Sequence, residues 1–92
     1  MEKLTLNGTF ETPTILLDSN RGLLEFSGRS LPEDSSTFYR PILNWIEQYV
    51  TEPNEKTDIA IKLEYFNTAT SKVILNMLTK FEKTHNVTVQ WF

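Results

Sequence analysis

The sequence contains no cysteine, and this absence excludes disulfide bonds and catalysis by a thiol. A reducing compartment fits this composition, and because no signal peptide opens the chain, we expect a cytoplasmic protein. No apolar run approaches the roughly 20 residues that a membrane-spanning helix needs, so membrane insertion is not expected. The chain has 92 residues, 39% of them hydrophobic, which is typical of one globular domain covering residues 1–92.

Motifs for metals and phosphates are missing as well. The one histidine, His85, has no partner at metal-ligand spacing, and a role at the end of a helix, where cations are favoured, explains it better. The three glycines are isolated in turns and form no phosphate-binding loop. We therefore expect neither a metal nor another cofactor.

Positive charge is scattered rather than concentrated. Nine lysines and arginines are outnumbered by twelve aspartates and glutamates, and the net charge is −3 at pH 7. Because no basic stripe is visible, a nucleic acid is not the expected partner. Another protein or a small ligand is left.

Alternating and amphipathic stretches predict seven elements in the order β-β-β-α-β-α-β. The clearest strand is Asp58–Phe66, which places Ile59, Ile61, Leu63 and Tyr65 on one face. The expected strands are Leu4–Leu6, Thr14–Leu17, Leu23–Ser27, Asp58–Phe66 and Val87–Phe92, and the expected helices are Ser35–Val50 and Thr68–His85.

The two strand-helix-strand units imply parallel pairing with right-handed crossovers. Lys62 and Glu64 occupy the second face of the Asp58–Phe66 strand, so that face is expected to meet water. Both helices should then cover the opposite face. The predicted fold class is α/β, a two-layer sandwich of a mixed β-sheet with two helices mainly on one face.

The start of the first helix has competing signals. Ser30 and Glu33 have capping-box spacing, while Asp34 and Ser35 offer a second cap. Pro41 lies inside the apolar stripe, so the helix either begins near Tyr39 or is kinked at the proline.

The junction between the Asp58–Phe66 strand and the second helix carries four small polar residues. Helix N-termini have free backbone N–H groups and partial positive charge, so a hydroxyl there caps the helix, and a phosphate there is stabilised. Capping alone is the commoner reason for such a cluster. The four residues are Asn67, Thr68, Thr70 and Ser71.

An enzyme finds little support in the sequence. The adjacent acids Glu33 and Asp34 suggest a general acid–base pair, but acids near a helix start also interact favourably with the helix dipole. No partner residue for acid–base chemistry accompanies them. We expect no catalytic activity.

With these residues in view, the chain resembles the SiaC family of small bacterial regulatory phosphoproteins. The most specific stretch is Tyr65–Lys72, where family members carry a Tyr-x-Asn-Thr-Ser-Ser-like signature, with Ala69 here in place of a usual serine. Family members also tend to continue past the aromatic end into an acidic segment, whereas this sequence ends at Phe92. The other matching stretches are Thr12–Ile15, Gly28–Ser35 and Pro41–Tyr49.

The resemblance implies a STAS-like fold, as in anti-sigma-factor antagonists, and a switch at Thr68. This threonine would be phosphorylated by a kinase of the histidine-kinase-like ATPase type and dephosphorylated by a PP2C-type phosphatase. The unmodified protein would bind and activate a diguanylate cyclase or another signalling enzyme. The residues expected to contact that partner are Arg29, Ser30, Glu33, Asp34, Asn67, Thr70 and Ser71.

Two other classes of function stay open at this point. One is a STAS-type module that binds a small ligand or a protein without a covalent switch. The other is a small enzyme that uses Glu33 or Asp34 as a base, which requires a raised pKa for that carboxyl group.

Overall fold

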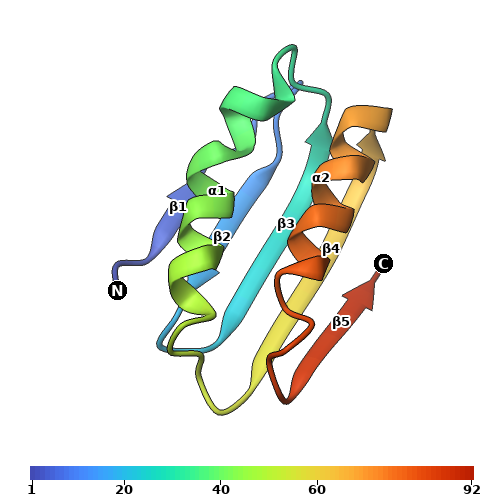
Figure 1. Ribbon diagram of the computed structural model, residues 1–92. Helices are drawn as coiled ribbons and strands as arrows, with labels where there is room; N and C mark the ends of the chain where they lie inside the picture. Colours follow the sequence, from blue (N-terminus) through green and yellow to red (C-terminus); the bar gives the residue numbers. More distant parts are fainter.

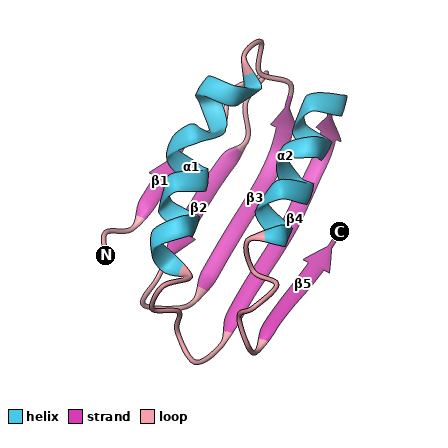
Figure 2. Cartoon of the chain, in the orientation of Figure 1, coloured by secondary structure: helices cyan, strands magenta, loops and turns pink.

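The computed structural model describes residues 1–92 and has the predicted order of elements. The chain forms one five-stranded sheet and two helices, and Figure 2 shows the helices packed along the sheet. The strands are β1 (Leu4–Leu6), β2 (Thr14–Asp18), β3 (Leu23–Ser30), β4 (Thr57–Phe66) and β5 (Val87–Trp91), and the helices are α1 (Ser35–Tyr49) and α2 (Thr68–Thr79).

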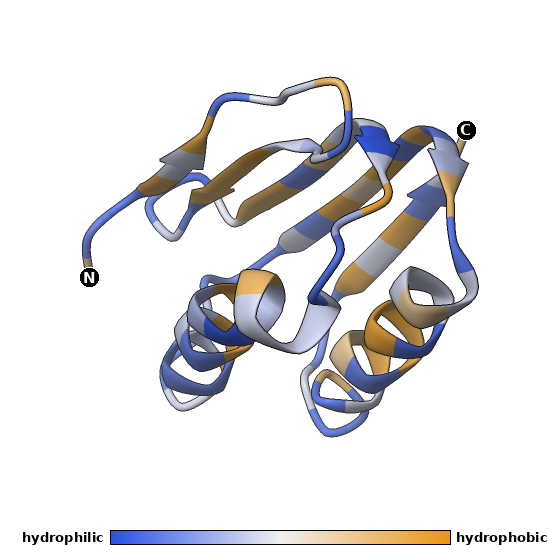
Figure 3. Ribbon diagram, turned by 90° about the horizontal axis from the view of Figure 1, so that it is seen from above, coloured by the Kyte–Doolittle hydropathy of each residue, from blue (hydrophilic) through white to orange (hydrophobic).

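The strands lie in the sheet in the same order as in the sequence, β1-β2-β3-β4-β5. The pairs β1–β2 and β2–β3 are antiparallel, whereas β3–β4 and β4–β5 are parallel. Parallel neighbours need a crossover, and α1 and α2 supply the two crossovers. Figure 3 shows both helices on one face of the sheet, so the predicted two-layer architecture is confirmed.

The core fills the space between the helices and the covered face of the sheet. Burying each large aliphatic side chain there contributes about 1.5–3 kcal/mol. On the open face, Lys62 and Glu25 form an ion pair at 3.5 Å, which confirms that this face meets water. Neither helix combines the length and apolarity needed to cross a bilayer. The core residues are Ile15, Leu17, Leu24, Phe26, Tyr39, Ile42, Trp45, Ile46, Tyr49, Ile59, Ile61, Leu63, Ile74, Met77 and Phe81.

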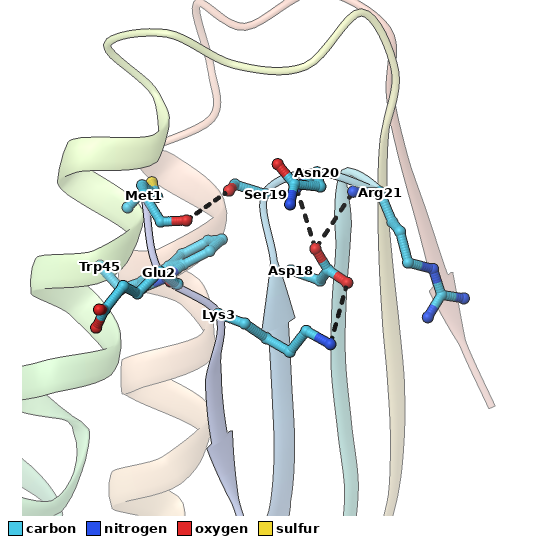
Figure 4. Close-up of polar contacts among 8 residues, drawn as sticks. All are labelled: Met1, Glu2, Lys3, Asp18, Ser19, Asn20, Arg21 and Trp45. Atoms are coloured by element: carbon cyan, nitrogen blue, oxygen red, sulfur yellow. Dashed lines mark hydrogen bonds and ion pairs between the residues drawn. The ribbon is translucent and has the colours of Figure 1, made fainter.

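The N-terminal strand is attached to both layers (Figure 4). The Trp45 indole on α1 donates to the carbonyl of Glu2 at 2.9 Å, and Lys3 lies 3.8 Å from the Asp18 carboxylate. Asp18 is only 4% exposed and also accepts two backbone N–H groups of the turn that follows β2. Its negative charge is therefore compensated where it is buried, and the short β1 edge is held in place.

The structure decides between the alternatives that the sequence left open for the start of α1. β3 continues to Ser30 because Arg29 and Ser30 pair with the end of β4. Ser30 is therefore a strand residue, and Asp34 is the N-cap of α1. The predicted start at Ser35 is confirmed, and because the helix continues through Pro41, the alternative start near Tyr39 is excluded.

Tyr65 does not share the buried face that its alternation predicted. Gly28 pairs with Leu63, but Arg29 pairs with Tyr65. The register therefore shifts at a bulge, and Glu64 has no partner residue in β3. A bulge of this kind inverts the facing of the residues beyond it. Gly28 has φ of +91°, which a residue with a side chain rarely adopts. Tyr65 is 59% exposed as a result.

α2 ends at Thr79, six residues before the predicted end at His85. The N–H groups of Lys80, Phe81 and Glu82 bond to carbonyls three residues earlier, so the chain continues in tight turns that keep Phe81 buried. The apolar spacing that suggested a longer helix is satisfied by these turns. His85 lies too far beyond the helix end to cap it, and the role predicted for it is wrong.

Candidate functional site

The residues expected to form the site gather at one end of the sheet, where the strands β3 and β4 finish. Because β3 and β4 are parallel, their carboxyl ends lie at the same edge, and α1 and α2 both begin there (Figure 1). We call this region the junction edge and define it as residues 29–35 and 65–71. It brings together two helix N-termini, each with free backbone N–H groups.

Asn67 makes the turn from β4 into α2. Its backbone is extended, and its side-chain Oδ1 accepts the N–H of Thr70 at 2.8 Å, so Asn67 is the N-cap. Its own N–H donates to the carbonyl of Ser30 at 3.2 Å, which ties the cap to β3. The predicted start of the helix at Thr68 is confirmed.

Thr68 is the first residue of α2 and is exposed to solvent. Its hydroxyl takes part in none of the side-chain hydrogen bonds around the junction. The N–H groups of Thr68 and Ala69 belong to the first turn and have no partner within the helix. An accessible hydroxyl therefore sits beside free donors at the positive end of a helix.

Thr70 points the other way, into a buried chain of hydroxyl groups. Its Oγ1 donates to the Ser30 carbonyl at 3.0 Å and lies 2.8 Å from Ser30 Oγ, which lies 2.6 Å from the Tyr39 hydroxyl. Since each hydroxyl has one proton, Ser30 donates to Thr70 and Tyr39 donates to Ser30. We call these three residues the hydroxyl cluster. It joins β3, α1 and α2.

Burial of the hydroxyl cluster corrects two of the expected partner contacts. Ser30 and Thr70 are 0% exposed, so their side chains do not reach a partner in this fold. Ser30 was expected in an exposed loop but lies in β3. The hydroxyls that remain exposed on the first turn of α2 belong to Thr68 and Ser71.

Burial raises the pKa of the Tyr39 phenol above its ordinary value of 10.0, and its hydrogen bond with Ser30 and the nearby hydroxyl of Thr70 offset part of that rise. The phenol therefore stays protonated, as its donation to Ser30 requires. Sequence reasoning missed Tyr39, although it begins an apolar stripe at helical spacing with Ile42, Ile46 and Tyr49.

Arg29 pairs with Tyr65 at the junction edge, on the face of the sheet that the helices leave open, and it is half-buried. Its guanidinium carbon is 4.6 Å from the centre of the Phe10 ring and 5.2 Å from the centre of the Tyr65 ring. Such cation–π contacts hold the guanidinium in place. Its Nε is buried without a hydrogen-bond partner.

The hydrogen bonds of Asp34 are those of a helix N-cap and do not suit a general base. Its carboxylate accepts the Thr37 hydroxyl at 2.8 Å and the Thr37 N–H at 3.2 Å, and these bonds lower the pKa of Asp34 below its ordinary value of 3.8. A general base at neutral pH needs a raised pKa instead. Glu33 beside it is exposed.

None of the surface hollows is lined by residues of the β4–α2 junction. A groove of about 330 Å³ runs between α1 and α2, and its lining includes Ser35, Arg40 and Lys80 but neither Asn67 nor Thr68. Two further hollows lie elsewhere and are lined almost entirely by polar residues. Small-molecule sites are usually apolar with a few polar groups. No group of three or more histidine, aspartate or glutamate residues is placed to hold a metal ion.

Comparison with known proteins gives one consistent family. Residues 6–92 match the family model of SiaC family regulatory phosphoproteins. The chain is 28% identical to an uncharacterized protein of Pseudomonas aeruginosa strain UCBPP-PA14, over 99% of this chain and 75% of the relative.

Solved structures agree in fold. The crystal structure of apo-SiaC from Pseudomonas aeruginosa has a TM-score of 0.87 at 28% identity, covering 99% of this chain and 78% of that chain. A chain in the crystal structure of the diguanylate cyclase SiaD in complex with its activator SiaC, from the same organism, has a TM-score of 0.86 at 26% identity. That match covers 96% of this chain and 75% of the other.

The hydroxyl cluster predicts unequal effects of two changes on the same helical turn. Thr70→Val keeps the side-chain shape but leaves the Ser30 hydroxyl without an acceptor, so the free energy of unfolding should fall by about 1–3 kcal/mol. The control Ser71→Ala alters an exposed hydroxyl and should change it by less than about 0.5 kcal/mol. Urea denaturation followed by tryptophan fluorescence measures both, and equal losses would show that the cluster does not stabilise the fold.

The raised pKa of Tyr39 predicts a loss of stability at alkaline pH. Since the folded protein holds this proton more tightly than the unfolded chain, the contribution is fully present below pH 10.0 and is lost as the pH rises through the raised pKa. Unfolding free energies measured from pH 7 upward should fall more steeply for the unaltered protein than for Tyr39→Phe. The control Tyr65→Phe should retain the steep fall, and a steep fall in Tyr39→Phe would contradict the assignment.

Proposed function

The chain belongs to the SiaC family of regulatory phosphoproteins, and we propose that it is a non-enzymatic regulator switched by phosphorylation of Thr68. In its unmodified form it binds a signalling enzyme, a diguanylate cyclase, as the activator SiaC does in its complex with SiaD. The observation that carries the proposal is the exposed hydroxyl of Thr68 at the first position of α2, directly after the Asn67 cap.

The start of α2 suits a phosphate group. A phosphothreonine carries about −1.5 to −2 charges at pH 7, and the free N–H groups and positive helix end favour an anion there. Asn67 continues to cap through Thr70, because neither of these residues uses the Thr68 hydroxyl. Phosphorylation therefore leaves the fold intact.

Phosphorylation of Thr68 also changes the charge and shape of the surface that a partner would contact. Glu33 and Asp34 already give the neighbouring α1 start negative charge, and a dianion on Thr68 adds to it at the same edge. A partner surface that fits the neutral hydroxyl then faces added bulk and repulsion. Loss of binding without loss of folding is what a reversible switch requires.

The proposed partner contacts come from the accessible part of the junction edge. Ser30 and Thr70 support this surface from beneath through the hydroxyl cluster rather than touching the partner. Residues 1–92 form one regulatory domain that carries the switch. The contact residues proposed besides Thr68 are Arg29, Glu33, Asp34, Asn67 and Ser71.

Two enzymes complete the proposed cycle. A kinase of the histidine-kinase-like ATPase type transfers the phosphate to Thr68, and a PP2C-type phosphatase removes it. These partners rest on the family resemblance, and the exposure of Thr68 supports them because both enzymes must reach the hydroxyl.

The first test is site-resolved phosphorylation. Incubation with the cognate kinase and Mg·ATP should add a single phosphate on Thr68, Thr68→Ala should take none, and Ser71→Ala should still be modified. Thr68→Ala should also keep the cyclase bound, whereas Thr68→Asp should fold normally and bind it less tightly.

Two outcomes of the phosphorylation test would contradict the proposal. Phosphate only on Ser71 would move the site by three residues. No phosphate on any residue, together with undiminished cyclase binding by Thr68→Asp, would refute the switch and favour a binding module without covalent control.

The second test separates contact residues from supporting residues. Glu33→Gln is expected to weaken cyclase binding by up to about tenfold, as rim contacts typically do, with an unchanged melting temperature. Ser30→Ala should instead lower the melting temperature, because it breaks the hydroxyl cluster. Calorimetric titration and thermal unfolding measure the two effects, and unchanged binding by Glu33→Gln would remove Glu33 from the interface.

A further inference from the structure

The two edges of the sheet differ sharply. β1 has only three residues, and the contacts of Trp45 and Asp18 hold its approach in place. β5 lies at the opposite edge, where its only neighbour in the sheet is β4 (Figure 1). The β1 edge strand is short and held by side-chain contacts, whereas the β5 edge strand is longer and pairs only with β4.

The open edge lacks the features that normally protect such strands. Natural edge strands are blunted by lysine, proline, bulges or brevity. Residues 87–92 contain no charged residue, no proline and no glycine. Val89 is 43% exposed, Trp91 is 51% exposed and Phe92 is 66% exposed. An uncharged, apolar, unprotected strand of this kind is suited to pairing with another strand.

The backbone groups available for pairing follow from the contacts with β4. The Thr57 N–H donates to the Asn86 carbonyl at 3.0 Å, and the Phe92 N–H donates to the Ile61 carbonyl at 2.9 Å. In a parallel ladder alternate residues face the neighbouring strand, so the even-numbered residues of β5 face β4. Both backbone groups of Val87, Val89 and Trp91 therefore point outward.

We propose that β5 pairs antiparallel with β5 of a second copy of this chain, with the two-fold axis at Val89. In this register Val89 lies opposite its own counterpart and Val87 lies opposite Trp91. It is the register in which all three outward-facing residues meet one another as hydrogen-bonded pairs. The two five-stranded sheets then form one continuous sheet.

The side chains fit this register as well. Val87, Val89 and Trp91 pair with Thr57, Ile59 and Ile61 of β4, so they lie on the helix-covered face. Across the two-fold axis they form an apolar row in which each valine at 87 meets a tryptophan, a favourable type of cross-strand pair. Thr88 and Gln90 meet on the open face, and no like charges oppose one another.

A second copy is the favoured occupant because the edge complements itself. A two-fold interface uses the same patch twice, and an uncharged strand with regularly spaced free groups meets that requirement without a complementary charge on a partner. The protected β1 edge offers no equivalent surface, so the pairing closes at two copies instead of continuing into a fibre.

The test begins with the mass of the 92-residue chain in solution. Light scattering after size-exclusion chromatography should give about twice the chain mass of 10.7 kDa. Val89→Lys should give a monomer that still unfolds cooperatively, since Val89 is already partly exposed and like charges would face each other at the axis. Leu75→Lys, which alters an exposed residue of α2, is the matched control and should remain dimeric.

Register is tested by charge and by cross-linking. Mixing Val89→Lys with Val89→Glu should restore the doubled mass. Because the chain has no cysteine, Val89→Cys introduces a single thiol and should form a disulfide-linked dimer on mild oxidation, while Gln90→Cys should not, since its counterparts lie diagonally apart. A monomer at high concentration overturns the proposal, as does a dimer that survives Val89→Lys.

Discussion

The junction edge depends on three buried hydroxyl groups in series. Tyr39 donates to Ser30, Ser30 donates to Thr70, and Thr70 closes the chain on the carbonyl of Ser30. These bonds cross from α1 through β3 to α2 in a place where water cannot substitute for a missing partner, so an incomplete cluster is costly. The cluster therefore fixes where α2 begins, and with it the position of Thr68.

Thr68 and Thr70 lie on one helical turn but in opposite surroundings, one exposed to solvent and one buried. Two residues along an α-helix correspond to a rotation of about 200°, so their side chains point to nearly opposite sides. Thr70 stabilises the fold from inside, while the hydroxyl of Thr68 is exposed and makes no hydrogen bond with another side chain. A covalent change on the outer residue can therefore alter recognition without disturbing the inner one.

Local signals in the sequence were sufficient for the order of elements, the two-layer arrangement and the start of α2, because alternation, amphipathic spacing and an asparagine cap are short-range features. They failed where distant strands decide. Tyr65 was assigned to the wrong face because the bulge arises from pairing between β3 and β4. Ser30 has the spacing of a cap, yet pairing with Phe66 draws it into the sheet. The proposal of a switch at Thr68 rests on the resemblance, because spacing alone does not distinguish such a site from ordinary capping.

The sequential order of the strands also bears on how the protein is made. Each strand pairs with the one synthesised just before it, so the sheet can grow in the direction in which the ribosome releases the chain, without waiting for a distant segment. β1 to β3 need only hairpin contacts, whereas Thr70 joins Ser30 across forty positions of sequence. The junction edge is consequently completed late, and a nascent chain displays it in full only once most of the domain has been synthesised.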